Sequence, residues 1–139
     1  MSETLRPFHL AIPVDDLEAA RSFYGGVLGC AEGRASKDWI DWNFDGHQLV
    51  THKSVPVRSE TNMVDGHDVP TLHFGLVMPW ADWEALAAKL KDADADFLIE
   101  PGIRFAGHRA EQATLFVRDP AGNALEFKAF RDDKYLFAK

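Results

Sequence analysis

The sequence predicts an α+β protein built from two copies of one strand–helix–strand–strand–strand (βαβββ) module. A short apolar strand that contains a histidine, residues 7–14, precedes a helical run, and the same order recurs from residue 72. Each half then closes with a turn and a strand, at residues 44–50 and 117–127. A chain of 139 residues has room for one substantial core, so we expect the two modules to form a single domain over residues 1–139.

The first module is expected over residues 6–55. Asp15 or Asp16 follows the first strand and suits a helix N-cap, since a carboxylate there accepts unpaired backbone N–H groups. Residues 39–44 alternate between two unlike faces, which is typical of a strand. Asp45–Gly46 predicts a hairpin turn into the module's last strand.

The sequence leaves the end of the first helix open. Apolar residues recur every three or four positions from Leu17 to Leu28, the pattern of a helix that packs on a sheet. Gly25–Gly26 interrupts this stripe, and Gly29 is expected to stop the helix.

A polar linker over residues 56–70 separates the modules, and we expect its residues 57–69 to be either a connection or a lid over a site. The second module is expected over residues 71–130, followed by a polar-aromatic tail over residues 131–139.

Within the second module, Asp82 is the expected helix N-cap. A short strand at residues 97–99 is expected to stop at Pro101–Gly102. A loop is expected over residues 105–112, before two closing strands.

Composition excludes several classes of partner. The net charge of −7 and the lack of a Lys/Arg run argue against nucleic acid and anionic membranes. The single cysteine, Cys30, forms no internal disulfide, which suits a reducing compartment. No leader pattern and no apolar run of about 18 residues is present. We therefore expect a cytoplasmic protein that acts on a small molecule.

Three residues suit a metal site. His9 and His73 occupy the same place in the two first strands, and Glu126 lies in the last strand of the second module. Two imidazoles and one carboxylate bind a divalent transition metal on one face and leave positions open for substrate. Separations of 64 and 53 residues carry no signal by themselves, so the prediction depends on where the three residues lie in the repeat.

The chain resembles the vicinal oxygen chelate superfamily over residues 6–130. The marks are the stretch HLAIPVDDL at residues 9–17 with Phe23–Tyr24 and Leu28–Gly29, and the stretch DPAGNALE at residues 119–126. That superfamily includes glyoxalase I, bleomycin-resistance proteins, fosfomycin-resistance transferases and extradiol dioxygenases. These marks are typical of the superfamily and do not select a reaction.

The resemblance implies two βαβββ modules whose curved mixed sheet encloses a metal cup, often completed across a homodimer. It places the metal ligands on His9, His73 and Glu126, with Fe(II) or Mn(II) favoured and Zn(II) or Ni(II) as alternatives. Glyoxalase I has a fourth ligand in the last strand of its first module. Aligning Gly46 with Gly122 puts Val50 there, while Gln48 and His52 share its face.

The leading hypothesis is a dioxygenase-like oxidoreductase with a 2-His-1-carboxylate site. His52 or His108 would serve as acid or base, and Trp39, Trp42 and Phe105 would form an aromatic wall.

Three alternatives stay open. A glyoxalase I-like lyase would need Gln48 or His52 on the metal. A fosfomycin-type thiol transferase would need a cationic pocket, for which Arg104, Arg109 and Lys128 are available although the net charge is against it. A non-enzymatic, bleomycin-type sequestering protein would use an acidic, aromatic groove and would lack the metal ligands.

Overall fold

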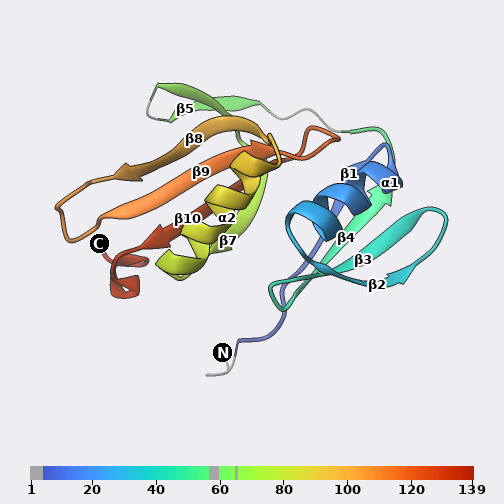
Figure 1. Cartoon of the computed structure of the whole chain (residues 1–139), viewed down its shortest axis with the longest axis horizontal. Coiled ribbons are helices and arrows are strands. Elements are labelled where there is room, and N and C mark those ends of the chain that lie inside the picture. Colours follow the sequence, from blue (N-terminus) through green and yellow to red (C-terminus); the bar gives the residue numbers. More distant parts are fainter. Residues whose placement is uncertain (1–4, 57–59, 65) are drawn as a thin grey trace. The chain divides into compact units, whose positions relative to one another are not determined.

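The computed structural model describes residues 5–56, 60–64 and 66–139. Figure 1 shows the course of the chain, which divides into two compact units. The first unit is Met1–Val57 with Pro120–Asn123, and the second is Arg58–Asp119 with Ala124–Lys139. Each unit contains one four-stranded mixed sheet with helical structure, so the predicted α+β fold and its repeat are confirmed.

The sheet of the first unit has the order β1-β4-β3-β2. Its strands are β1 (His9–Val14), β2 (Ala31–Ala35), β3 (Trp39–Phe44) and β4 (His47–Lys53). β1 pairs with β4 in parallel, and the other pairs are antiparallel. The predicted turn at Asp45–Gly46 is present, and both residues have positive φ angles of 52° and 87°.

The helix of the first unit begins at the predicted place and then changes from an α-helix to a π-helix. Asp16 is the N-cap of α1 (Leu17–Ala20), because its carboxylate accepts from the backbone N–H groups of Glu18 and Ala19. From there the chain continues as the π-helix η1 (Arg21–Val27), and Gly29 follows with a φ of 74°. A π segment accommodates an extra residue in a helix, which explains why the apolar stripe lost its period at the glycine pair.

One face of this first sheet forms the core. Ile40, Trp42 and Leu49 are each at most 2% exposed. The ring of Trp42 lies 6.2 Å from that of Tyr24, which η1 contributes, so the helix covers this face. The opposite face carries the alternate residues of the same strands.

The sheet of the second unit repeats the order as β7-β10-β9-β8. Its elements are β7 (His73–Val77), α2 (Trp80–Asp92), β8 (Asp96–Arg104), β9 (Gln112–Arg118) and β10 (Ala124–Phe130). β7 pairs with β10 in parallel, as β1 does with β4. The two units therefore share one topology.

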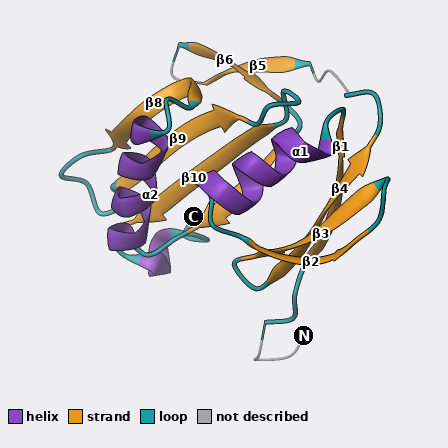
Figure 2. Cartoon of the chain, turned by 45° about the vertical axis from the view of Figure 1, so that its right-hand side comes forward, coloured by secondary structure: helices purple, strands orange, loops and turns teal. Residues whose placement is uncertain are grey.

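The helix α2 covers one face of the second sheet, as Figure 2 shows. Trp83 and Leu90 on α2 are buried, and Leu115 and Leu125 on the sheet have no exposed surface. The indole N–H of Trp83 donates to the backbone carbonyl of Phe127 over 2.8 Å and fixes the helix to β10. The other face of this sheet carries His73 and Glu126, two of the predicted metal ligands.

Three expectations need correction. The linker contains an additional hairpin of β5 (Thr61–Val64) and β6 (His67–Pro70); of the expected lid, residues 57–59 and 65 lie outside the described residues. β8 continues through Pro101–Gly102 with irregular register, so the predicted stop is wrong. The N-cap of α2 is Pro79, and Asp82 lies in the first turn.

The tail contains a short 3₁₀ helix, η2 (Asp133–Tyr135), capped by the Asp132 carboxylate. In the described ranges, no helix is both long and apolar enough to cross a membrane.

Candidate metal centre

The face of the second sheet opposite α2 carries a row of polar side chains. Strand register places His73, Gly75 and Val77 of β7 directly beside Ala124, Glu126 and Lys128 of β10. Phe116 and Thr114 of β9 lie next to Glu126 and Lys128 on the other side. Paired residues point to one face of a sheet, so all these positions border a common surface.

His73 is oriented by the chain immediately before β7. Its Nδ1 lies 2.8 Å from the backbone carbonyl of Pro70, at the end of β6. A carbonyl only accepts, so Nδ1 is the donor in this contact, and in the neutral form of the ring the lone pair lies on Nε2. The Phe116 ring contacts the imidazole edge-on at 5.1 Å and restricts its rotation. Nε2 is therefore free to bind a metal.

Glu126 faces that lone pair. Its Oε1 lies 3.7 Å from His73 Nε2, beyond hydrogen-bonding range, while Oε2 accepts the hydroxyl of Thr114 over 2.7 Å. The Lys128 ammonium lies 3.7 Å from the same Oε1. The carboxylate side chain is 13% exposed. One oxygen is thus held by β9, and the other points toward His73 and Lys128.

Gly75 lets these strands approach closely. It is paired with Glu126, and a Cβ added there would collide with the backbone carbonyl of Glu126. Only glycine tolerates this approach of β7 to β10. The sequence pattern did not mark Gly75, although a glycine inside an apolar strand signals close backbone contact.

The chemistry of this pair suits a metal ion. Two ligands about 2.1 Å from a metal stand roughly 3.0–3.4 Å apart in octahedral or tetrahedral geometry. The Nε2–Oε1 distance of 3.7 Å needs only a small adjustment to reach that range. With a neutral imidazole both atoms are acceptors, and a cation bound between them would be coordinated by both. His73 and Glu126 therefore fit two positions of a divalent metal site.

His9, the third predicted ligand, belongs to the first unit. Its Nδ1 lies 2.8 Å from Oε1 of Gln48, its partner in the β1–β4 register. In that arrangement Nδ1 donates to the amide oxygen, and Nε2 again keeps the lone pair. In both predicted histidine ligands Nδ1 contacts an oxygen acceptor, an arrangement that suits metal binding through Nε2.

The register also supports the predicted mismatch between the modules. His9 pairs with Gln48 as His73 pairs with Ala124, so Val50 occupies the place of Glu126. Val50 is 6% exposed and has no ligating atom. The first unit accordingly offers a histidine and an orienting amide, without a carboxylate at the equivalent position.

The register separates the predicted aromatic residues. Trp39 pairs with His52, and both share the face of Gln48 and His9, whereas Trp42 lies on the opposite face. The Trp42 indole is 2% exposed and donates to the Thr51 hydroxyl over 3.1 Å. The prediction that both tryptophans line an aromatic wall is therefore wrong for Trp42, which strand alternation puts in the core. Trp39 lies on the same face as His9, and the Arg34 guanidinium lies 5.8 Å from the centre of its ring.

The remaining predicted residues lie at the far end of β8. Arg104 is paired with Gln112 and so shares the face of Thr114. Phe105 follows it, 53% exposed, with a positive φ of 55°. His108 lies in the loop before β9, where its Nδ1 accepts from the N–H of Ala110. The substrate-binding role of Arg104 and Phe105 and the acid–base role of His108 stay predictions.

The described part of the chain contains no group of three His, Cys, Asp or Glu side chains placed to hold a metal within the structure. The pair of His73 and Glu126 lies in one unit and His9 in the other. The three-ligand set therefore stays a prediction, of which the second unit supplies two members with defined geometry.

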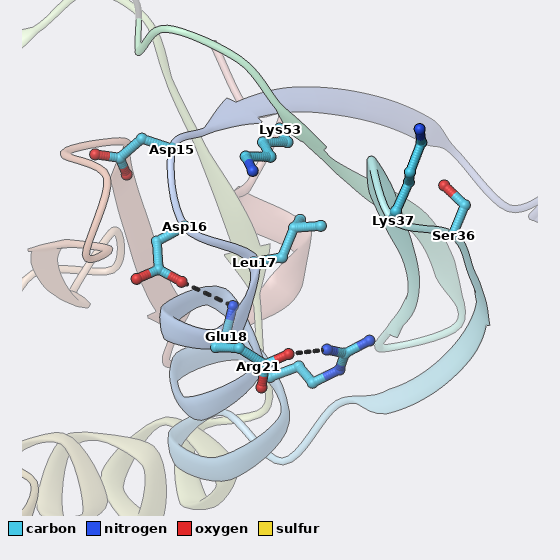
Figure 3. A pocket seen from close by; sticks show the side chains of 8 residues that line it. All are labelled: Asp15, Asp16, Leu17, Glu18, Arg21, Ser36, Lys37 and Lys53. Carbon is cyan, nitrogen blue, oxygen red and sulfur yellow. Dashed lines mark hydrogen bonds and ion pairs between the residues drawn. The ribbon is translucent and has the colours of Figure 1, made fainter.

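A separate pocket of about 390 Å³ opens in the first unit, at the start of α1. Figure 3 shows its lining, which combines three acidic and three basic side chains with Leu17 and Ser36. Arg21 there is paired with Glu18 and with Glu32, so much of its charge is satisfied internally. None of the predicted site residues lines this pocket.

Thr114 and Gly75 are functional candidates that sequence reasoning missed. Thr114 is two residues from Phe116 on β9, and only the antiparallel register places its hydroxyl against Glu126. The sequence held no local signal for this contact, because the two residues lie on different strands.

Comparison with known proteins identifies the family of the chain. A sequence model of the Glyoxalase/Bleomycin resistance protein/Dioxygenase superfamily matches residues 6–127. No curated protein matches the sequence. A solved glyoxalase/bleomycin resistance protein/dioxygenase from Alicyclobacillus acidocaldarius is 35% identical, with a TM-score of 0.81 over 99% of this chain and 100% of that one.

Two more distant structures share the fold. The fosfomycin resistance protein FosX from Listeria monocytogenes is 13% identical, with a TM-score of 0.69 over 93% of this chain and 94% of its own. A lactoylglutathione lyase from Agrobacterium tumefaciens is 18% identical, with a TM-score of 0.66 over 99% and 100%. With its sequence match across most of the chain and its duplicated sheet, the protein belongs to the Glyoxalase/Bleomycin resistance protein/Dioxygenase superfamily.

Proposed function

We propose that this protein is a metal-dependent enzyme that binds a small substrate through neighbouring oxygen atoms, and that its reaction is of the dioxygenase type. The observation that carries the proposal is the pair of His73 and Glu126, whose Nε2 and Oε1 atoms stand 3.7 Å apart on one face of the second sheet.

Three ligands with open coordination distinguish this proposal from its alternatives. His9 would complete the set with His73 and Glu126, and Val50 supplies no fourth ligand. Gln48, which a lyase of the glyoxalase I type would need on the metal, is engaged with His9 Nδ1. This supports a site in which substrate oxygens occupy the remaining positions.

The residues have separate tasks in the proposed reaction. A bound Fe(II) or Mn(II) would supply Lewis acidity toward a substrate hydroxyl and a centre for oxygen activation. His73 and Glu126 hold it, Thr114 fixes the carboxylate, and the Pro70 carbonyl fixes the imidazole tautomer. His52, exposed on the site face of the first sheet, is the proposed acid or base.

The test is anaerobic reconstitution with Fe(II) or Mn(II), followed by oxygen uptake and absorbance measurements with a panel of catechols. Metal-dependent oxygen consumption, lost in His73→Ala, is the expected result. Methylglyoxal with glutathione, assayed in parallel, examines the lyase alternative. Turnover there and none with catechols would overturn the dioxygenase assignment.

A sequestering role is the main non-enzymatic alternative. It predicts tight binding of a cationic drug with no need for metal. If the purified protein takes up no transition metal, the enzymatic proposal fails, and the affinity for a cationic drug is the next quantity to measure.

A further inference from the structure

Lys128 is a charged group on the site face that the proposed metal chemistry does not use. It follows Glu126 by two residues on β10, and its ammonium lies 3.7 Å from Glu126 Oε1. The side chain is 31% exposed, so it reaches both the carboxylate and the surface. Val77 on one side and Thr114 on the other are its partners in the sheet register.

A metal and Lys128 would compete for one oxygen. Oε2 of Glu126 already accepts the Thr114 hydroxyl, which leaves Oε1 as the ligand atom that faces His73. A metal about 2.1 Å from Oε1 would stand within about 6 Å of the Lys128 nitrogen. Two like charges at that separation repel, so metal binding deprives the ammonium of its counter-ion. An anionic group of a bound substrate would then be the favourable partner for Lys128 at this place.

The surroundings of Lys128 leave room for such a partner. Val77 beside it is 42% exposed, and Gly102 lies beyond Thr114 in the same row, without a side chain. Phe116 flanks the next row, beside Glu126. A small substrate with an apolar body and a negative group would find complementary contacts on this surface.

We propose that the substrate carries an oxyanion group, such as a carboxylate, next to its metal-chelating oxygens, and that Lys128 binds this group and selects for it. The inference rests on the proposed function, because chelation sets where the substrate lies. It names the chemistry of the substrate, which the metal ligands alone leave open.

The experiment compares two probes on the Fe(II)-loaded protein without oxygen: catechol and 3,4-dihydroxybenzoate. We expect the wild type to bind the carboxylated probe at least about tenfold more tightly than Lys128→Met does, with catechol affinity unchanged. Comparing the ratio of the two affinities between variants cancels the different acidities of the probes. Lys128→Arg should keep the preference, and so should Lys89→Met, which removes the same charge from the exposed side of α2.

Metal retention separates this role from a supporting one. If Lys128 served only to hold Glu126, Lys128→Met would weaken metal binding, and that result would overturn the proposal. We expect retention that is equal or tighter, because a repelling charge is gone. An unchanged probe ratio in Lys128→Met would also overturn it.

Failure of the proposed function gives a different pattern. If the protein takes up metal but binds neither catechol nor 3,4-dihydroxybenzoate, the proposal that the substrate chelates the metal fails. The role of Lys128 is then assessed with benzoate, which has a carboxylate and no chelating hydroxyls. Benzoate binding that Lys128→Met abolishes would support the anion site, and equal binding by both proteins would refute it.

Discussion

The Glu126 carboxylate is held from one side by Thr114 and left open on the other. The hydroxyl of Thr114, 5% exposed, donates to Oε2 and so fixes the plane of the carboxylate. Its Oε1 is thereby directed at His73. Outer partners of this kind adjust ligand orientation, and their loss typically weakens metal affinity about 10- to 100-fold.

Thr114→Val keeps the shape of the side chain and removes the hydroxyl. We expect Fe(II) or Mn(II) affinity to fall about tenfold or more, because the carboxylate loses the donor that orients it. Competition with a chelator of known affinity measures the change. Thr114→Ser restores the donor and should stay close to the wild type; equal losses in both variants would show that packing, rather than the hydroxyl, matters.

Glu111, which is not part of the candidate metal site, contributes to the stability of the fold. The N–H of Gly107 and then the Arg131 guanidinium lower the pKa of its carboxyl below the ordinary value of 4.5. A carboxyl whose pKa is lowered in the folded state stabilises the protein at pH values above its ordinary pKa. This stabilisation is lost as the pH falls through the lowered pKa.

Glu111→Gln should therefore flatten the acid side of the stability profile. Between roughly pH 5 and pH 3, the free energy of unfolding should fall less steeply with acid in this variant than in the wild type. Urea titrations at several pH values give both slopes. Parallel slopes would mean that the contacts of Glu111 do not distinguish the folded from the unfolded state.

At the scale of elements, the junction of β7 and β10 decides whether the two ligands meet. Gly75→Ala should force these strands apart at Glu126, since the new Cβ collides with its carbonyl. We expect a loss of about 1–3 kcal/mol in the free energy of unfolding, together with weaker metal retention. Chemical denaturation and metal titration report the two effects.

Gly26→Ala is the matched control, because a Cβ there meets nothing within 4 Å. Its stability should stay within about 1 kcal/mol of the wild type, and its metal retention should not change. A Gly75→Ala variant that behaves like this control would contradict the close approach of β7 and β10.

The elements also show where sequence patterns suffice and where they do not. Periodicity predicted most strands and the two helical runs, and side-chain chemistry restricted the first cap to Asp15 or Asp16, because these features depend on local sequence. The strand β2 was not located. The β5–β6 hairpin escaped prediction because its sequence is polar and lacks a clean alternation. β8 crosses Pro101–Gly102 because a register shift between Ile99 and Gly102 accommodates one extra residue, a tertiary effect without a local signal.

The sequence predicted the residues proposed to bind the metal, but not the groups that orient them. His73 followed from its equivalence to His9 in the repeat and Glu126 from its place in the last strand of the second module, and the structure brings the two together in one unit. Their partners, the Pro70 carbonyl and the Thr114 hydroxyl, depend on register and loop geometry that no sequence spacing encodes. The contact that orients the His73 ring is therefore known only from the structure.

For the whole molecule, the two units share a topology and differ in chemistry. Both have parallel outer pairs, β1 with β4 and β7 with β10, and both place a histidine at the start of the first strand. The last strands carry Val50 in one unit and Glu126 in the other. The proposed three-ligand set therefore draws two residues from the second unit, and His9 is the proposed third.

Metal content per chain tests this account most directly. After anaerobic Fe(II) loading and desalting, elemental analysis should find about one metal ion per wild-type chain and almost none in His9→Ala, His73→Ala or Glu126→Gln. His67→Ala, which removes a histidine of β6 that we assign to no site, should keep its metal. A folded His73→Ala or Glu126→Gln variant that retains the wild-type metal content would contradict the account.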